Sequence, residues 1–190
     1  MSAADEPALV EQARRDPQAF AELYDRYVDR IYAYAFRWCG EAALAQDVTS
    51  ATFEKALAHL RRTGWRGASY CAWLYRIARN ELIQHHRRQR NLVPLTATQA
   101  GEANIEAAFQ NKQERHRLFT ALGQLSAADQ EVLALRFFEE LSSAEVAEIL
   151  GCSTANVYLR LHRALERLRK EMNGGDSIFS DELAGEKDHV

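Results

Sequence analysis

The sequence predicts an all-α protein with two small helical domains joined by a flexible linker, the C-terminal domain being a helix-turn-helix. Apolar residues recur at helical spacing nearly throughout the 190 residues, and no stretch alternates with period two for long enough to form a strand. This periodicity weakens between Asn91 and Asn111, where Pro94 and Gly101 stand among polar residues. Further along, two capped helical segments flank Gly151, which is the spacing of a helix-turn-helix.

The first domain, residues 1–90, is predicted to contain three long helices. An apolar stripe from Phe20 to Trp38 marks the first helix, and Gly40 ends it. The second helix is expected over residues 42–60. Ser69 is a good N-cap for the third helix, which ends in the run HHRRQR.

Residues 91–113 form the predicted linker and residues 114–172 the second domain. There Ser126 is expected to cap one helix, and Ser142 with Glu145 has the spacing of a capping box ahead of the next helix. The last helix is predicted to start after Ser153 and to end at Met172. Residues 173–190 are polar and acidic, which favours a disordered tail.

The composition is typical of a folded cytoplasmic protein. Hydrophobic residues make up 47% of the chain, but no apolar run reaches the ~20 residues that a bilayer crossing needs. The acidic N-terminus lacks the apolar stretch of a secretory signal, and the three cysteines are odd in number and far apart, as expected of reduced thiols. We expect no cofactor, and a metal site is disfavoured because the adjacent His85 and His86 would point to different sides of a helix.

Charge is distributed unevenly along the chain. The formal net charge is −3, yet residues 61–90 contain eight arginines and one acidic residue, and residues 150–172 form a second basic cluster. Acidic stretches surround both clusters. Two basic islands on one chain indicate two nucleic-acid contacts. Solvated helix faces are the alternative interpretation of such arginine clusters.

Residues 142–170 carry the strongest local signal for DNA binding. Ala147 is small where two helices would cross, and Gly151 permits the tight turn between them. The second helix could then lie in the major groove of DNA. Its first turns would present Thr154, Asn156, Tyr158, Leu159, His162 and Arg163 outward. An ordinary antiparallel helix pair is the alternative.

In residues 61–90, tryptophans and tyrosines are interleaved with the arginines. Basic side chains neutralise phosphates, while aromatic rings offer surfaces on which unstacked bases can stack. This combination suits single-stranded or opening DNA better than an intact duplex. Trp73 falls on a helical stripe and is expected in the core. Trp65, in a loop with glycines, fits either the core or a surface on which a base can stack.

The segment WLYRIARNELIQHHRRQR, residues 73–90, resembles the promoter-melting region of extracytoplasmic-function sigma factors. QDVTSATFEKAL, residues 46–57, is similar to their core-binding helix, and residues 118–170 resemble their domain 4. These segments follow the family's order, with its linker length between them. The resemblance as a whole covers roughly residues 18–90 and 114–172.

The resemblance, with the exposed positions above, implies three sets of site residues. The set that binds core RNA polymerase comprises Asp47, Val48, Ser50, Ala51, Phe53, Glu54 and Lys55. The set for the −10 element comprises Trp65, Arg66, Ser69, Arg76, Arg79, Asn80, Gln84, Arg87 and Arg88. The set for the −35 element comprises Thr154, Asn156, Tyr158, Leu159, Arg160, His162 and Arg163.

The chain departs from the family pattern at two places. Ser50 and Ala51 stand where the family often has Gln-Glu, which removes two polar contacts from the core-binding helix. Gln84 replaces the acidic residue that usually precedes the paired arginines, so Arg87 and Arg88 lose a local partner.

The predicted function is that of a sigma factor, a non-catalytic subunit that directs core RNA polymerase to promoters and promotes strand opening. The expected partners are promoter DNA, the clamp coiled coil and flap of the polymerase, and an anti-sigma factor, without membrane insertion. A conventional helix-turn-helix regulator with an N-terminal sensing or dimerisation domain is the alternative. An enzyme is disfavoured because the sequence has no Gly-rich phosphate loop and no metal-binding motif.

Overall fold

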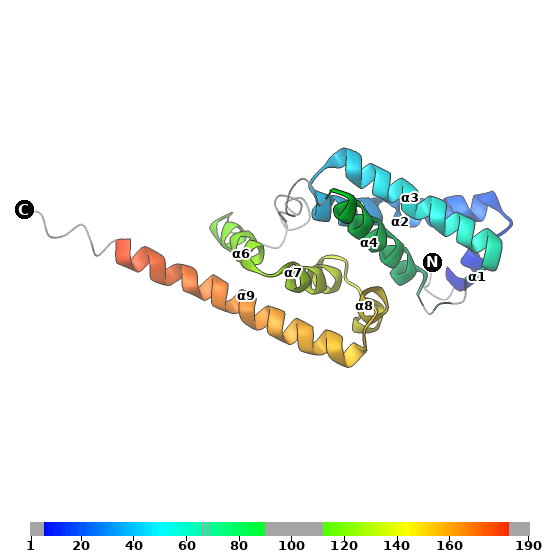
Figure 1. Cartoon of the computed structure of the whole chain (residues 1–190). Coiled ribbons are helices and arrows are strands. Elements are labelled where there is room, and N and C mark those ends of the chain that lie inside the picture. The colour runs from blue at the N-terminus through cyan, green and yellow to red at the C-terminus, as the bar shows by residue number, and fades with distance from the viewer. Residues whose placement is uncertain (1–5, 66, 68, 90–111, 183–190) are drawn as a thin grey trace, which may run out of the picture.

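The computed structural model describes residues 6–65, 67, 69–89 and 112–182. Within these ranges every regular element is a helix and none is a strand, which confirms the predicted fold class. Figure 1 shows two groups of helices, α1 to α4 in the N-terminal group and α6 to α9 in the C-terminal group. The predicted linker falls almost wholly in residues 90–111, outside the described residues.

The N-terminal group consists of α1 (Glu6–Gln12), α2 (Pro17–Cys39), α3 (Ala42–Thr63) and α4 (Tyr70–Gln89). The Asp16 side chain caps α2 by accepting a hydrogen bond from the Gln18 N–H at 2.9 Å, and Gly40 ends the helix with a φ of 67°. Ser69 caps α4 by accepting the Ala72 N–H at 3.1 Å. The three long helices are therefore confirmed, while α1 was not predicted.

Aromatic rings fill much of the core between α2, α3 and α4. Tyr34 and Tyr75 are fully buried, and their rings meet edge to face with centroids 5.2 Å apart. Trp73 is 7% exposed, so its predicted place in the core is confirmed. The fully buried aliphatic side chains around these rings are Leu23, Ile31, Leu60 and Leu74.

The C-terminal group consists of α6 (Lys112–Gln124), α7 (Ala127–Leu133), the π-helical turn η2 (Ala134–Phe138), α8 (Ser143–Leu150) and α9 (Thr154–Glu182). Ser126 caps α7, and Ser142 with Glu145 forms the predicted capping box of α8. Gly151 adopts a φ of 64° between α8 and α9. The predicted helix-turn-helix is thus present.

Helix α9 is longer than the sequence predicted. We expected it to end at Met172, but it continues through Gly174 and Gly175 to Glu182. Each glycine costs a helix ~1 kcal/mol relative to alanine. Such a cost weakens a helix without ending one that has already nucleated over the preceding turns. The expected helix end at Met172 was therefore wrong. The helix also includes residues 173–182, which were expected to belong to a disordered tail.

The turn after α7 was also not predicted. The Glu139 N–H donates to the Ala134 carbonyl at 3.0 Å, a π-type hydrogen bond, and the next residue, Glu140, has a φ of 56°. That conformation is uncommon for a residue with a Cβ. Turn η2 therefore redirects the chain between α7 and α8.

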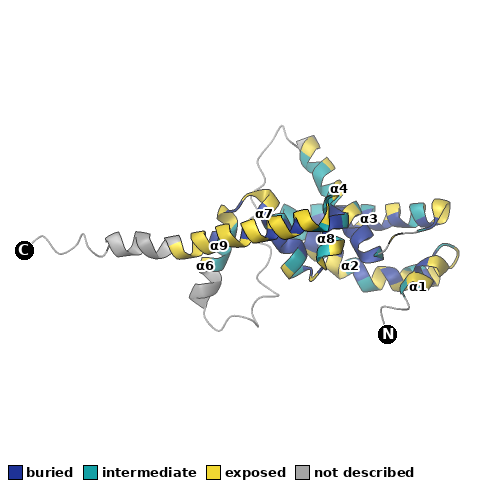
Figure 2. Ribbon diagram, turned by 90° about the horizontal axis from the view of Figure 1, so that it is seen from below, coloured by how far each residue is buried: buried dark blue, intermediate teal, exposed yellow. Residues whose placement is uncertain are grey.

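The two groups of helices are in direct contact, chiefly through α8 against α4. Figure 2 shows that burial is concentrated where helices face one another, while α9 is exposed along most of its length. Docking between the groups was not predicted, because helical periodicity identifies a buried face but not the element that covers it.

Two leucines of α9 provide a matched test of this packing. Leu161 is 7% exposed, whereas Leu159 on the same helix is 48% exposed. We expect Leu161→Ala to lower the free energy of unfolding by ~2–4 kcal/mol, because it removes buried methyl groups and leaves a cavity. Leu159→Ala should change it by less than ~0.5 kcal/mol. Urea unfolding followed by circular dichroism measures both, and equal losses would contradict the packing of α9.

Candidate nucleic-acid interface

The crossing of α8 and α9 is built from small and branched side chains. Val146, Ala147 and Val157 are buried where the two helices meet. Gly151 makes the turn, and the Ser153 hydroxyl caps α9 by accepting the Asn156 N–H at 3.2 Å. This packing, the turn and the cap fix the first turns of α9 with respect to α8. The outer face of these first turns has no helix over it (Figure 1).

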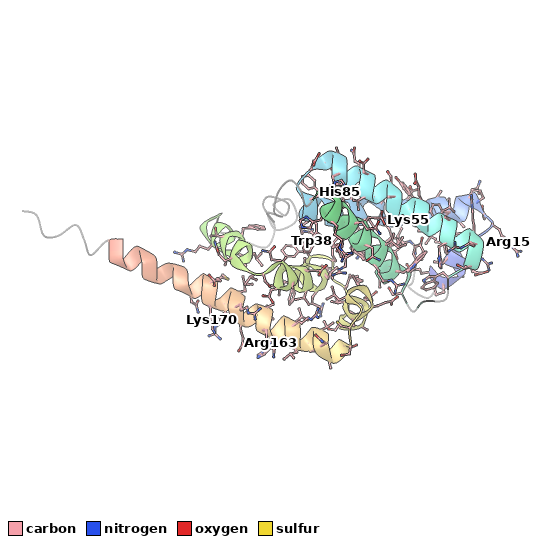
Figure 3. All side chains as sticks on the ribbon, viewed as in Figure 1. Arg15, Trp38, Lys55, His85, Arg163 and Lys170 are labelled. Carbon is pink, nitrogen blue, oxygen red and sulfur yellow. The ribbon has the colours of Figure 1, made fainter. Side chains whose placement is uncertain are left out.

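The exposed first turns of α9 carry the residues predicted to read the −35 element. Tyr158 is 61% exposed, Thr154 is half-buried, and the other five are exposed, namely Asn156, Leu159, Arg160, His162 and Arg163. Figure 3 shows Arg163 and Lys170 on α9, on the side turned away from the N-terminal group. Amide, guanidinium and phenol groups on one helix can reach base edges and phosphates in a major groove.

Arg167 lies on the same helix but has a structural partner. Its guanidinium contacts the Asp129 carboxylate at 2.5 Å, and the same carboxylate accepts a hydrogen bond from the Ser126 hydroxyl. Arg167 thus ties α9 to the start of α7. Arg163, one turn earlier, is exposed on the outer face and is better placed to meet a phosphate.

Helix α4 carries a second exposed polar surface. Its exposed members fall at helical spacing on one side and are called the α4 basic stripe: Arg76, Asn80, Gln84 and Arg87. These are four of the residues predicted for the −10 element. The side chains of Arg66 and Arg88, from the same predicted set, lie outside the described residues.

The loop before α4 places an indole against the first residue of that helix. Trp65 is half-buried and packs edge-on against Tyr70, with ring centroids 6.0 Å apart. A Cβ at Gly67 would approach the Trp65 Nε1 to 2.8 Å. Glycine is therefore required there for the indole to lie over the backbone. Trp65 is thus partly buried and packs against the core of the N-terminal group.

Two of the predicted −10 residues make contacts with the C-terminal group. Arg79 forms a two-point ion pair with Glu131 of α7, with distances of 2.6 Å and 3.1 Å. This hydrogen-bonded pairing raises the pKa of the guanidinium, against the effect of burial. The Ser69 hydroxyl donates to Glu145 of α8 at 2.7 Å. The Arg79 and Ser69 side chains are therefore both hydrogen-bonded to carboxylates of the C-terminal group.

The predicted polymerase-binding surface lies on α3. Asp47, Ser50 and Glu54 are exposed. Lys55 is also exposed and forms an ion pair with Glu81 of α4, while Ala51 is half-buried. Val48 and Phe53 are 4% exposed and lie in the core, so they position α3 and are not available to touch a partner.

Sequence reasoning missed the acidic residues that connect the two groups. Glu131, Glu139 and Glu145, here called the acidic face, all contact side chains of the N-terminal group. The only signal was the net negative charge of residues 91–149. Charge alone does not show which basic surface such residues will meet.

Three further features concern the part of the chain that the structure describes. None of the described helices combines the length and apolar character that a bilayer crossing requires. No group of three or more His, Cys, Asp or Glu side chains in the described ranges could hold a metal ion. The three cysteines are free thiols, and burial raises the pKa of Cys71 to about 12.

An exposed recognition helix and a separate basic stripe are features of the helix-turn-helix DNA-binding proteins. Comparison with known families narrows this class. The chain matches Sigma-70 region 2 over residues 23–92 and Sigma-70 region 4 over residues 115–168.

Similar proteins agree with both matches. The sigma factor BldN of Streptomyces coelicolor is 32% identical over 85% of this chain, which spans 64% of that protein. The sigma factor SigL of Mycobacterium tuberculosis is 34% identical over 77% of this chain and 85% of its own length. The structure of CnrH in complex with the cytosolic domain of CnrY is similar with a TM-score of 0.62 and 25% identity, covering 88% of this chain and 97% of CnrH. The chain belongs to the ECF RNA polymerase sigma factors.

The capping box at the entrance to the helix-turn-helix makes a pH-dependent prediction. Burial alone would raise the pKa of Glu145, but hydrogen bonds from Ser69 and Ser142 outweigh it and hold the pKa below its ordinary value of 4.5. A carboxylate with a lowered pKa stabilises the fold above its unfolded pKa, and this contribution is lost as the pH falls through the folded value.

We therefore expect the difference in unfolding free energy between the unmodified chain and Glu145→Gln to be constant above about pH 5 and to shrink below it. Urea unfolding at a series of pH values measures this difference. Glu148→Gln, on the same helix, is the matched control. A Glu145→Gln difference that does not change with pH would contradict the assignment.

Proposed function

We propose that this chain binds core RNA polymerase and directs it to promoters by reading two elements, the −35 element with α9 and the −10 element with α4. The observation that carries this proposal is the presence of two exposed polar surfaces, on α9 and α4, each within the segment that matches the corresponding sigma region. Matches to both regions in the same order favour this function over a conventional helix-turn-helix regulator.

At the upstream element, α9 would lie in the major groove with its first turns against the bases. Arg160 and Arg163 can donate two hydrogen bonds to a guanine or hold phosphates, and Asn156 can pair with adenine. Tyr158 and Leu159 are exposed apolar surfaces suited to thymine methyl groups or sugars. Phosphate contacts would supply most of the affinity and base contacts the sequence preference.

At the downstream element, the α4 basic stripe would follow the backbone of a separated strand. The half-buried Trp65, in the loop before α4, offers an aromatic surface against which an unstacked base can pack. Neither contact need be tight, because the second binding step is intramolecular once the first has formed.

The polymerase would be bound mainly through the exposed side chains of α3, with Asp47, Ser50, Glu54 and Lys55 at the surface. The proposed domains are residues 1–90 and 114–172, with a linker at 91–113. We further propose a non-catalytic role in the cytoplasm. CnrH was solved in complex with the cytosolic domain of CnrY, which supports the proposal that a second protein binds this chain as well, and we propose an anti-sigma factor as that partner.

Run-off transcription with purified core polymerase on a genomic promoter library tests this function. The chain should enable initiation at a discrete set of promoters, and Arg163→Ala should weaken initiation there by about 5- to 100-fold, the equivalent of losing one good base or phosphate contact. Arg169→Ala removes the same charge farther along α9 and should have a smaller effect. Normal transcription by Arg163→Ala would remove α9 as the reading helix.

Binding to core polymerase gives an independent test of α3. Asp47→Arg reverses an exposed charge on the predicted surface and should lower the affinity for core polymerase at least about tenfold, since like-charge contacts cost several kcal/mol. Glu22→Arg, an exposed charge reversal on α2, is the control. Fluorescence anisotropy of the labelled chain titrated with core polymerase measures both. Equal affinities of the two variants would place the polymerase surface elsewhere.

A further inference from the structure

Four arginines gather at the end of α3, where the turn between α1 and α2 lies against it. Two come from the last turn of α3 and two from the turn that precedes α2. They are called the arginine patch: Arg14, Arg15, Arg61 and Arg62. Figure 3 shows Arg15 at this end of the N-terminal group, on the far side from α6 and α7. None of the four belongs to the sets of site residues described above.

Gly64 joins the two halves of the patch. It follows α3 with a φ of 70°, and its N–H donates to the Leu60 carbonyl at 3.0 Å. The Arg14 guanidinium lies against it, because a Cβ on Gly64 would come within 3.2 Å of the Arg14 Cζ. Any larger residue would be strained by the positive φ and would push the guanidinium away. Glycine therefore lets the turn between α1 and α2 approach the end of α3 closely.

The chain itself provides little to neutralise the patch. Arg14 pairs with Glu11 at 2.7 Å, and the Asp16 carboxylate is used to cap α2. The other three arginines of the patch are exposed, and no carboxylate in the described ranges forms an ion pair with them. The patch therefore presents positive charge to solvent from two segments that are distant in the sequence.

Helix stability accounts for only half of this arrangement. Arg61 and Arg62 lie in the last turn of α3, where basic residues interact favourably with the negative end of the helix dipole. Arg15 instead stands directly before Asp16, the N-cap of α2, at the positive end of that helix. A cation is unfavourable there. The position of Arg15 is therefore better explained by an anionic partner outside the chain than by the stability of α2.

The patch adjoins the loop proposed to hold an unstacked base. Trp65 follows Gly64 directly, and its ring packs against Tyr70, the first residue of α4. The α4 basic stripe begins only at Arg76, about 9 Å further along the helix axis from Tyr70. Along the chain, Trp65 therefore lies between the patch and the stripe. Guanidinium groups bind phosphates through charge-assisted hydrogen bonds, whatever the base sequence.

We propose that the arginine patch binds phosphates of the separated promoter strand immediately downstream of the base held at Trp65, which extends the DNA-binding surface beyond the −10 element. This inference rests on the proposed function for the position of the strand. The contact is independent of sequence, and its role is to hold the strand apart once the duplex has opened. Its energy comes from phosphate neutralisation and therefore depends on salt.

Three fork-shaped promoter fragments test the patch in complexes of the chain with core polymerase. In the short fragment, the non-template strand ends at the downstream edge of the −10 element. In the second fragment it continues for several nucleotides, and in the third this extension carries neutral methylphosphonates in place of phosphates. Fluorescence anisotropy at a series of salt concentrations measures each affinity for the unmodified chain and for Arg61→Ala with Arg62→Ala.

We expect the double variant to bind the extended fragment about tenfold more weakly than the unmodified chain and to bind the short fragment equally well. Its salt slope on the extended fragment should fall by about 1 to 1.5, the value for two phosphates of a single strand. Neutral phosphates should weaken the unmodified complex about tenfold and the double variant much less, because the variant has already lost the contact. Both residues are exposed, so the melting temperature should not change.

Arg169→Ala with Lys170→Ala is the matched control. It removes the same charge from two adjacent exposed residues of α9 and should leave the ratio of affinities for the extended and short fragments unchanged. Titration of each variant with core polymerase in the absence of DNA shows whether the patch acts on DNA or on the polymerase.

Several results would overturn the inference. Equal binding of the charged and neutral extensions by the unmodified complex would show that these phosphates are not contacted. Losses from the variant and from methylphosphonates that simply add would show that the two act independently. Weaker binding of the double variant to core polymerase would assign the patch to the polymerase. Failure to bind even the short fragment would overturn the proposed function as well, whereas a failure confined to the extension would leave that function standing.

Discussion

The phenol of Tyr75 belongs to the core and to the contact between the two groups at the same time. Its ring is fully buried against Tyr34, and its hydroxyl donates to the Glu139 carboxylate. Burial and the nearby carboxylate raise the pKa of this phenol, so it remains a hydrogen-bond donor. A buried carboxylate without partners would cost several kcal/mol. The packing of α2 on α4, which brings Arg37 and Tyr75 together, is therefore the condition on which the position of the C-terminal group depends.

Helix α4 shows how one segment can serve three purposes. Leu74 and Ala78, one turn apart, face the core, while the α4 basic stripe faces solvent. Arg79 lies between these two faces and reaches α7. A helix offers these separate faces because consecutive residues are about 100° apart around its axis. The sequence WLYRIARNELIQHHRRQR is consequently neither purely a core segment nor purely a basic one.

Local features of the chain were predictable from sequence because their causes are local. The caps at Ser69, Ser126 and Ser142, the turn at Gly151 and the exposure of Tyr158 all follow from residue type and helical spacing. Family membership was also predictable, from ordered segments with the right separation.

Features that depend on residues distant in the sequence were not predictable. Glu139 reads as one more acidic residue in an acidic stretch, and nothing near it indicates that it would meet Arg37, which lies about a hundred positions earlier. Turn η2 is stabilised by Arg30 and Arg136 as well as by its own backbone, so its conformation is not encoded in residues 134–138 alone. Val48 and Phe53 entered the polymerase-binding set through the family pattern, although helical spacing predicts that they are buried, and both are buried.

The length of α9 has a consequence for how the molecule responds to heat. The helix has 29 residues, and its last part extends beyond the other helices of its group (Figure 1). Helical structure that lacks tertiary support is held by intrinsic propensity, which Gly174 and Gly175 reduce. This end of α9 should therefore fray gradually on warming. The far-ultraviolet circular dichroism signal should accordingly decrease steadily at temperatures well below the cooperative unfolding of the two cores.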